Sequence, residues 1–411
     1  MSHYPVAALG DVCDIAAGGT PSRSVTEYFD GDIPWVKIGD LAQGTVTSTA
    51  ERITQSGLEG SAAKVFPAGT VLMSIFATIG RTAVLGIDAA TNQAIAGITP
   101  RDPRRLDSVY LRHYFDSITA NLVKAARGVA QLNINLGILK ALPLPLPPLP
   151  EQRRIAAILD QAGALRAKRR EALAQLDSLT QSIFIEMFGD PSRNPKSWPE
   201  TVLSKLVREN DTINYGVVQP GDALDEGIPL VRVGDLVDGE FSSTTLKRID
   251  PIIESAYKRS RLRGDEILVS CVGSIGVTVL ATPAMKGFNI ARAVARIPLA
   301  DRANRIFIAS YLQTDAVQNY FTAELRTVTQ PTLNIKQIAE TKVFSPPLAL
   351  QEVFATRIQA VESLKTTHRA ALAESNALFA SLQHRAFAGQ LSAGQRPAAF
   401  ATIAPCAPPT P

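Results

Sequence analysis

An internal repeat constrains the fold of this chain more than any other feature of its sequence. The segment Ile33–Leu41, IPWVKIGDL, returns as Ile228–Leu236, IPLVRVGDL, and a positive charge is kept where Lys37 becomes Arg232. Similarity of this kind along a chain means that one structural plan has been used more than once. The sequence therefore predicts two related domains rather than a single large one, in agreement with its length of 411 residues.

Two further landmarks extend the repeat over most of the chain. The pattern S-x-x-x-x-I-G occurs at Ser74–Gly80 and again at Ser270–Gly276. The motif Pro-Pro-Leu begins at Pro147 and at Pro346, and each copy leads into a long stretch rich in Ala, Leu, Arg and Glu. We predict a mixed domain at 1–148, a long helix at 149–189, a second mixed domain at 190–347, a second long helix at 348–391 and a flexible Pro/Ala tail at 392–411.

Both long stretches have the periodicity of an amphipathic helix, with apolar residues at three- and four-residue spacing. These residues include Ile155, Ile158, Leu159, Leu165 and Leu176 in the first stretch, and Ile358, Val361, Leu372, Leu382 and Phe387 in the second. A helix over Glu151–Phe188 is about 57 Å long. We predict that the two helices pair as an antiparallel coiled coil related by a pseudo-two-fold axis, and helices of another subunit remain an alternative partner.

The domains between the long helices combine strand and helix patterns. The β-branched runs Thr70–Ser74 and Glu266–Ser270 predict strands, whereas Val109–Ala126 and Ile306–Ala323 predict helices. The fold class is therefore α/β or α+β in both domains. Between the landmarks the copies diverge, since GGTPSRSVTEYFDGD in the first faces NYGVVQPGDALDEG in the second. A shared scaffold with different loops predicts two related surfaces with different targets.

The divergent loops and the repeated motifs hold residue types that suit contact with nucleic acid. Glycine lets the backbone approach a phosphate or a base edge closely, and Asn, Gln and Arg can form paired hydrogen bonds with adenine or guanine. The candidates in the first domain are Gly18, Gly19, Thr20, Ser22, Lys37, Thr78, Gly80, Asn92 and Gln93. The candidates in the second domain are Tyr215, Gln219, Arg232, Ser274, Gly276, Asn289 and Arg292. The plainer interpretation is that the loops are tight turns and that the polar residues are ordinary surface groups.

Composition limits the remaining classes of function. Three cysteines, Cys13, Cys271 and Cys406, and four histidines show no metal-ligand spacing, so neither a zinc site nor a disulfide framework is expected. No uncharged apolar stretch reaches the ~18 residues that span a bilayer, and we expect a cytoplasmic protein. No phosphate-binding, methylation or dinucleotide motif occurs, which predicts no cofactor and no catalytic centre. The net charge of +4 is compatible with a polyanionic partner and is too small to indicate one.

The ordered set of motifs resembles a known family. PPLPEQRRIAAIL (Pro147–Leu159) and SLQHRAFAGQL (Ser381–Leu391) resemble the central and C-terminal regions of specificity subunits of type I restriction-modification systems. GGTPS (Gly18–Ser22), IPWVKIGDL and S-x-x-x-x-I-G resemble parts of their target-recognition domains, so the resemblance covers nearly all of residues 1–391. The second copy, PPLALQEVF, lacks the Pro-Glu of the first, which puts equal partner contacts at the two ends in doubt.

The resemblance implies a subunit that binds a bipartite site on double-stranded DNA, with one half-site per domain and the helices as a spacer of fixed length. It also implies two modification subunits, which bind S-adenosylmethionine and methylate adenine, and restriction subunits, which use ATP to translocate DNA and cleave it. Three alternatives remain open: a self-contained nuclease or methyltransferase, an assembly scaffold without sequence-specific DNA binding, and a specificity subunit of a modification-only complex.

Overall fold

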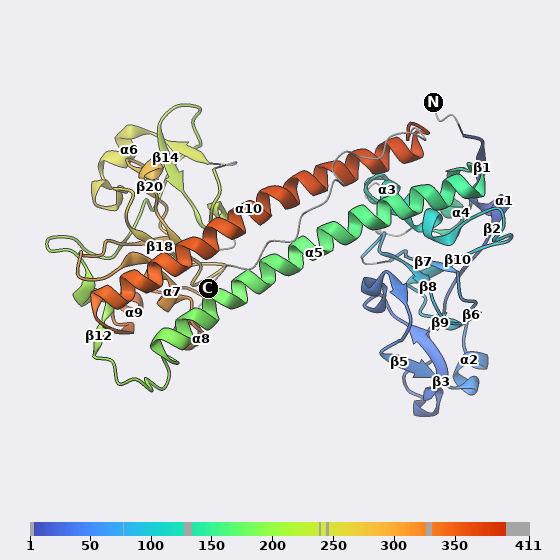
Figure 1. The fold of residues 1–411 in the computed structure, drawn as a ribbon, viewed down its shortest axis with the longest axis horizontal. Coiled ribbons are helices and arrows are strands. Elements are labelled where there is room, and N and C mark those ends of the chain that lie inside the picture. The colour runs from blue at the N-terminus through green and yellow to red at the C-terminus, as the bar shows by residue number, and fades with distance from the viewer. Residues whose placement is uncertain are drawn as a thin grey trace, which may run out of the picture. The chain divides into compact units, whose positions relative to one another are not determined.

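The computed structural model describes residues 4–76, 78–126, 134–237, 240–243, 246–325 and 331–391, so the predicted tail at 392–411 lies outside the described residues. The chain divides into two compact units (Figure 1). Unit 1 contains Met1–Arg170 and Ala371–Pro411, and unit 2 contains Glu171–Ala370. Each unit therefore includes one end of each long helix, whereas the sequence-based division treats the helices as segments apart from the domains.

Unit 1 combines short strands with helices of very different lengths. Its strands are β1 (Val6–Ala8), β2 (Cys13–Ala17), β3 (Phe29–Val36), β4 (Thr45–Val46), β5 (Glu51–Ile53), β6 (Val65–Phe66), β7 (Val71–Ser74), β8 (Thr82–Leu85), β9 (Ala89–Thr91), β10 (Ile95–Pro100) and β11 (Pro143–Pro145). Its helices are α1 (Leu9–Val12), α2 (Gln55–Glu59), α3 (Ser108–Ala126), α4 (Leu136–Lys140) and the first part of α5 (Leu149–Phe188). The α5 helix begins two residues before the predicted Glu151 and ends at the predicted Phe188.

The core of unit 1 lies on both faces of a five-stranded sheet with the order β2-β10-β7-β8-β4. Successive side chains of a strand point to opposite faces, so Val71 and Met73 of β7 pack in one apolar cluster and Leu72 packs in another. Helix α3 covers the first cluster, to which it contributes Tyr110 and Phe115. Because both faces of β7 are covered, its sequence is a continuous apolar run instead of an alternating one.

Unit 2 repeats this plan with one strand fewer in each of its two larger sheets. Its strands are β12 (Glu200–Val202), β13 (Asn214–Tyr215), β14 (Ile228–Val231), β15 (Leu236–Val237), β16 (Glu240–Phe241), β17 (Lys247–Ile249), β18 (Ile267–Ser270), β19 (Thr278–Leu280), β20 (Asn289–Ile290), β21 (Val294–Ile297) and β22 (Lys342–Phe344). Its helices are α6 (Pro251–Ser255), α7 (Arg305–Leu312), α8 (Asp315–Ala323), α9 (Ile335–Ala339) and the first part of α10 (Leu348–Phe387). Short 3-10 helices in the two units span Thr26–Tyr28, Asp40–Gln43, Leu203–Leu206, Val233–Asp235, Lys258–Ser260 and Pro283–Met285.

The sheets of the two units correspond strand by strand. The order β13-β21-β18-β19 in unit 2 matches β2-β10-β7-β8 in unit 1, and β17-β14-β20 matches β5-β3-β9. In each second sheet the repeated IPxV strand pairs in parallel with its neighbour, through Val36 and Thr91 in unit 1 and through Val231 and Ile290 in unit 2. The prediction of mixed domains built on one plan is confirmed.

The helical region of unit 2 differs from its prediction in one respect. A single helix over Ile306–Ala323 was expected, but α7 ends at Leu312 and α8 begins at Asp315. Thr314 has an extended backbone, with ψ of 150°, and its hydroxyl donates to the Tyr311 carbonyl. A threonine that bonds to a nearby carbonyl in this way favours the end of one helix and the start of another, a competition that an apolar pattern does not reveal.

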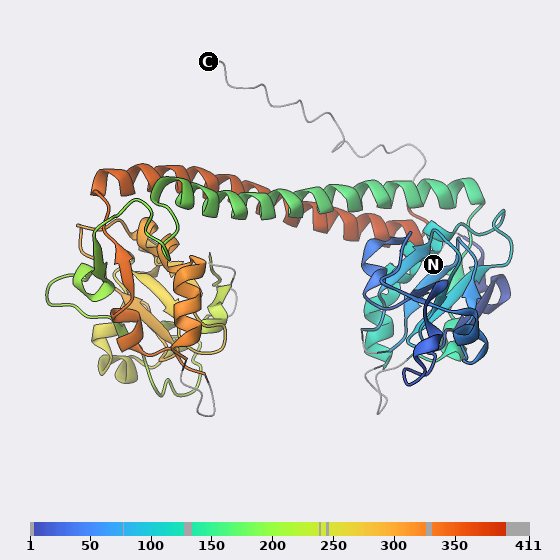
Figure 2. The same ribbon diagram turned by 90° about the horizontal axis from the view of Figure 1, so that it is seen from below.

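In each unit the two long helices lie side by side and run in opposite directions (Figure 2). In unit 1, Arg154 near the start of α5 donates to the carbonyl of Leu391, beyond the end of α10, at 2.8 Å. In unit 2 the ring of Phe188 at the end of α5 lies 5.3 Å from that of Phe354 near the start of α10. The antiparallel pairing predicted from the apolar spacing is therefore present within each unit.

A buried glutamine attaches the start of each long helix to its domain. Gln152 in α5 donates to the carbonyl of Pro147 at 2.8 Å and accepts from the Asp107 N–H at 2.9 Å. Gln351 in α10 donates to the carbonyl of Pro346 at 2.8 Å and accepts from the Asn304 N–H at 2.9 Å. The motif PPLALQ lacks the Pro-Glu of PPLPEQ, yet both copies keep the residue that makes this attachment.

Candidate nucleic-acid interface

Antiparallel pairing brings the predicted contact residues of unit 1 to one end of its main sheet. Strands β2 and β7 finish at this end, and β10, which lies between them, begins there. The segments that enter or leave these strands must therefore meet. We call this region, formed by 18–24, Lys37, 78–81 and 92–94, the loop end of unit 1.

The two glycines of GGTPS are explained by close backbone packing at this loop end. The Gly18 N–H donates to the carbonyl of Ile95 at 3.0 Å, and the Gly19 N–H donates to that of Thr91 at 2.9 Å. A Cβ atom on Gly18 would lie 2.1 Å from Thr91 Oγ1, and one on Gly19 would lie 2.2 Å from the backbone of Ala62. Because real Cβ atoms do not approach so closely, these positions require glycine for the fold itself.

The side chains that follow the glycines are exposed and interact with the neighbouring turn. The Thr20 hydroxyl donates to Gln93 Oε1, which links the GGTPS loop to the turn between β9 and β10. Ser22 bonds to Ser24 at 2.8 Å, and both are exposed. Asn92 is half-buried, and its Oδ1 accepts from the Ala94 N–H at 3.1 Å, so part of its amide stabilises the turn.

Lys37 belongs to a small charged group beside these loops. Its ammonium pairs with Glu51, which also accepts from Arg23 at 2.6 Å. The hydrogen bond from Lys37, followed by that from Arg23, lowers the pKa of Glu51. The Arg23 guanidinium also lies over the ring of Phe29, 4.5 Å from its centroid. Two cations therefore share one carboxylate beside these loops.

The S-x-x-x-x-I-G motif forms the same serine-bonded turn in both units. The buried Ser74 hydroxyl donates to the carbonyl of Thr78 and accepts from the Arg81 N–H at 2.9 Å. In unit 2 the buried Ser270 hydroxyl donates to the carbonyl of Ser274 and accepts an N–H from the residue after Gly276 at 2.9 Å. The turn leaves Thr78 and Ser274 exposed at equivalent places.

Unit 2 has a corresponding loop end, formed by 216–219, Arg232, 271–276 and 291–293 at the same end of its main sheet. Gln219 and Arg292 are exposed there. Tyr215 is half-buried and donates to the carbonyl of Leu333 at 2.7 Å; burial raises its pKa to about 12, although the charge of Arg292 acts in the opposite direction.

One glycine of this loop end was missed by the sequence analysis. A Cβ atom on Gly216 would lie 1.6 Å from the carbonyl oxygen of Ile290, so Gly216 fills the place that Gly18 has in unit 1. Its position directly after the first strand of the main sheet is the signal that would have identified it, because Gly18 also follows its strand directly.

The charged residue of the repeated motif has a structural role in both units. The backbone N–H of Lys37 donates to Asp40 at 2.8 Å, and that of Arg232 donates to Asp235 at 2.8 Å. The Arg232 guanidinium also bonds to the buried Asp235 carboxylate at 2.9 Å. The K/R-x-G-D sequence is thus a turn closed by its aspartate, which explains why it is repeated.

Asn289 contradicts its prediction as a base contact. It is completely buried in β20, and its amide donates to Glu254 at 3.0 Å and to the carbonyl of Tyr257 at 3.1 Å. Its Oδ1 accepts from the Ser260 hydroxyl at 2.7 Å. A side chain with these bonds inside the unit does not face a ligand, and residue type alone could not distinguish this case from an exposed asparagine.

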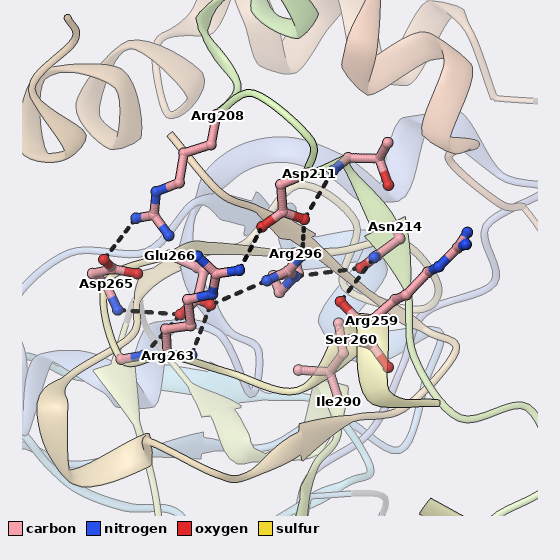
Figure 3. Close-up of polar contacts among 12 residues, drawn as sticks. Arg208, Asp211, Asn214, Arg259, Ser260, Arg263, Asp265, Glu266, Ile290 and Arg296 are labelled. Carbon is pink, nitrogen blue, oxygen red and sulfur yellow. Dashed lines mark hydrogen bonds and ion pairs between the residues drawn. The ribbon is translucent and has the colours of Figure 1, made fainter. Parts of the chain in front are cut away.

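A buried ion cluster supports the strands of unit 2 that lead to this loop end (Figure 3). Arg296 of β21 is 2% exposed and pairs with Asp211 and, at 3.3 Å, with Glu266. Glu266 also accepts three backbone N–H groups, from Arg263 at 2.8 Å and from the next two residues. Charges taken out of water need such partners, so the cluster fixes β13, β18 and β21 relative to one another.

The predicted helix-pairing residues divide into two groups. Ile155, Leu159, Ile358, Val361 and Leu382 are buried, whereas Ile158, Leu165, Leu176, Leu372 and Phe387 are half-buried. Several of them pack on a domain as well as on a helix; the ring of Phe387, for example, lies 5.4 Å from that of Tyr110 in α3. The apolar face is therefore shared between the opposite helix and the domain core.

Within the part of the chain that the structure describes, no group of three or more His, Cys, Asp or Glu side chains is placed to hold a metal ion. None of the described helices is both long enough and apolar enough to cross a membrane. Both described cysteines, Cys13 and Cys271, are buried, and burial raises the pKa of each thiol to about 12.

Two mixed domains of one plan, each with a loop end and each containing one end of two paired helices, define a two-domain repeat protein. A family model described as the type I restriction modification DNA specificity domain matches residues 1–175 and 217–374. The chain belongs to this family. The type I restriction enzyme EcoBI specificity subunit of Escherichia coli is 28% identical to it over 95% of this chain and 86% of its own.

Further relatives and solved structures agree. The MjaIX specificity subunit of Methanocaldococcus jannaschii is 29% identical over 63% of this chain and 63% of its own. The fold is similar to the crystal structure of a type I restriction-modification S subunit from M. genitalium, with a TM-score of 0.53, 16% identity and coverage of 94% and 96% of the two chains. A structure from work on assembly of the type I R-M system has a TM-score of 0.56, 20% identity and coverage of 94% and 98%.

Proposed function

We propose that this chain specifies the DNA sequence on which a type I restriction-modification complex acts, and that each unit binds one half of a bipartite site through its loop end. The observation that carries the proposal is the convergence of the predicted residues. With the exceptions of Asn289 and of Tyr215, which ends β13 directly before the loop end of unit 2, every one lies at the loop end of its unit, although they come from segments far apart in the sequence.

The exposed side chains of the two loop ends support recognition of a different DNA half-site by each unit. Unit 1 presents Thr20, Ser22, Thr78 and Gln93, whereas unit 2 presents Gln219, Ser274 and Arg292. Hydroxyl, amide and guanidinium groups are those that contact phosphates and base edges. Because the scaffolds correspond and the exposed side chains differ except at Thr78 and Ser274, the two units are suited to different half-sites.

In this proposal the long helices set the distance between the two half-sites and form a docking surface for the modification subunits. Each is a continuous helix of 40 residues with one end in each unit. A continuous helix transmits a change of length along its axis, at about 1.5 Å per residue. The partner subunits carry out methylation and cleavage, and this chain recognises the DNA sequence and assembles the complex.

The test is to co-express the chain with its modification subunits and to sequence the methylated adenines of the host DNA. We expect a split motif, with two short defined halves around an unspecified gap. An insertion of one helical turn after Arg170 should change the length of the gap and leave both halves unchanged, and an altered half would contradict the spacer role. As a control, Arg104→Ala changes a surface side chain that is 92% exposed and lies away from the loop end.

Unmodified DNA despite a stable complex would instead favour an assembly scaffold. Modification without cleavage, when every subunit of the system is present, would indicate a modification-only complex. Methylation or cleavage of DNA by the purified chain alone would overturn the division of labour.

A further inference from the structure

The two loop ends share one β-turn whose geometry is the same in both units. In unit 1 the Asn92 N–H donates to the carbonyl of Val36 at 3.1 Å, and the Ile95 N–H donates back to that of Asn92 at 3.2 Å. In unit 2 the Ala291 N–H donates to Val231 and the Val294 N–H to Ala291, each at 2.9 Å. The turn connects the second sheet to the main sheet in each case.

The first residue inside this turn is Gln93 in unit 1 and Arg292 in unit 2. A further hydrogen bond establishes the equivalence, because in both units the carbonyl of the next residue accepts the N–H of the residue directly after the motif serine: Ala94 from Ile75, and Ala293 from Cys271, each at 2.8 Å. Both Gln93 and Arg292 are exposed. One backbone position thus presents two different long polar side chains.

We propose that this turn position reads one base pair in each half-site, with Gln93 selecting adenine and Arg292 selecting guanine. The inference rests on the proposed function and adds the base chemistry to it. Gln forms two hydrogen bonds with the N6 and N7 groups of adenine, and Arg forms two with O6 and N7 of guanine.

The surroundings of each side chain suit this role. The Thr20 hydroxyl donates to Gln93 Oε1, which holds the amide in one orientation; the second lone pair of Oε1 and the NH2 group remain for the two bonds to adenine. Among the described residues, the Arg292 guanidinium makes no hydrogen bond or ion pair, unlike Arg232, which is bonded to Asp235. A guanidinium that is exposed and not neutralised by a carboxylate keeps its paired donors for a ligand.

A base contact and a phosphate contact can be separated by Arg292→Lys. Lysine keeps the positive charge but lacks the planar pair of donors, so it satisfies a phosphate and does not replace two bonds to guanine. Arg292→Gln tests the proposed match between side chain and base directly, since it gives unit 2 the side chain that unit 1 has at this turn position. Gln93→Arg is the reciprocal variant in unit 1.

The experiment is sequencing of methylated adenines after co-expression of each variant with the modification subunits. With Arg292→Gln we expect one G·C pair of one half-site to become A·T, and with Arg292→Lys we expect that pair to lose about 10- to 100-fold of its preference, while the other half-site stays unchanged. Gln93→Arg should convert an A·T pair to G·C in the other half-site. Arg263→Gln is the matched control, because this arginine has a 62% exposed side chain and precedes the start of β18, at the opposite end of the strand from the loop end.

The outcomes separate this inference from the proposed function. A split motif in the wild-type protein that stays the same in all three variants would overturn the inference and leave the proposed function intact. An unchanged motif with Arg292→Lys together with a degenerate one with Arg292→Gln would show a phosphate contact and would also overturn it. If a variant yields no methylation, equilibrium binding of its complex to duplexes with each base pair at that position gives the same comparison, and equal affinity of the wild type for all four would reject the reading role.

Discussion

The same point of the main sheet is built in opposite ways in the two units. Gly97 of β10 pairs with Leu72, and Arg296 of β21 pairs with Leu268, so the two positions are equivalent. In unit 1 a Cβ atom on Gly97 would lie 2.4 Å from the ring of Phe66, which covers the strand. In unit 2 the arginine side chain covers the strand and is neutralised by Asp211 and Glu266.

This difference shows that the two copies share their backbone geometry but not the type of side chain that covers the sheet. Strand order and register are kept, while an aromatic ring over a glycine is replaced by a buried ion cluster. Both solutions exclude water from the sheet, but they respond differently to substitution. A ring packed against a glycine is destabilised when a substitution adds volume, whereas a buried ion cluster is destabilised when a substitution removes one of its charges.

The largest effect is expected for Arg296→Met. It leaves Glu266 without its cation and Asp211 with only the more distant Arg263, at 3.8 Å, and should lower the free energy of unfolding of unit 2 by about 3–5 kcal/mol. Amide hydrogen exchange measures this unit by unit, since protection should fall in β21 and remain in β10. Arg208→Met is the matched control, because its partner Asp265 is 51% exposed and the pair contributes at most ~1 kcal/mol. Equal losses for the two variants would mean that burial does not decide the effect.

Gly97→Ala should destabilise unit 1 by about 1–3 kcal/mol, because the added methyl group overlaps the Phe66 ring. The cost should be smaller when Phe66 is already Leu, and a double-mutant cycle on thermal unfolding measures that coupling. A cost that is the same in both backgrounds would show that the contact with Phe66 is not its origin.

Substitution of the two buried glutamines tests a feature that the two units share, the attachment of each long helix to its domain. Gln152→Leu and Gln351→Leu each leave buried backbone groups without partners, and each should cost about 1–3 kcal/mol. Hydrogen exchange at the first turns of α5 and α10 should report similar losses in the two units. A large loss in only one would show that the shared glutamine is not the main attachment of both helices.

The glycines of the serine-bonded turns should respond unequally. Gly80 and Gly276 both have positive φ, of 87° and 81°. A Cβ atom at Gly80 would lie 2.3 Å from Thr119 Cγ2, a short and rigid side chain, and one at Gly276 would meet the amide end of Gln318, which can rotate away. We expect Gly80→Ala to cost about 1 kcal/mol more than Gly276→Ala in chemical denaturation, and the reverse order would contradict this explanation.

The smallest effect is a gain of stability from Asp116→Asn in unit 1. Desolvation by its neighbours raises the pKa of Asp116, but the residue is exposed, so the effect on stability is small; the equivalent residue in unit 2 is the neutral Gln313, which bonds to the carbonyl of Thr278. An acid with a raised pKa in the folded state stabilises fully below its ordinary value of 3.8, and this contribution is lost as the pH rises through the raised value. The variant should therefore melt slightly higher than the wild type at pH 7, with a difference that shrinks toward pH 4. A difference that is constant with pH would exclude titration of Asp116 as the cause.

Much of the fold follows from the sequence because its signals are local or repeated. The apolar spacing of Glu151–Phe188 predicts a helix from its own residues, and the runs before Ser74 and Ser270 predict strands in the same way. The S-x-x-x-x-I-G motif is also local, since its serine bonds within the turn. The candidate residues of the loop ends were found partly by their type, and their convergence follows from strand order.

The sequence by itself determined that one plan is used twice, that each copy ends in a long amphipathic helix, and which loops differ between the copies. Only the tertiary structure decided that Asn289 is buried, that Gly216 takes the place of Gly18, and that Arg296 is neutralised by Asp211. These facts depend on segments that are distant in the chain and adjacent in space. Burial and pairing are properties of the neighbours that folding supplies, and neither residue type nor periodicity encodes them.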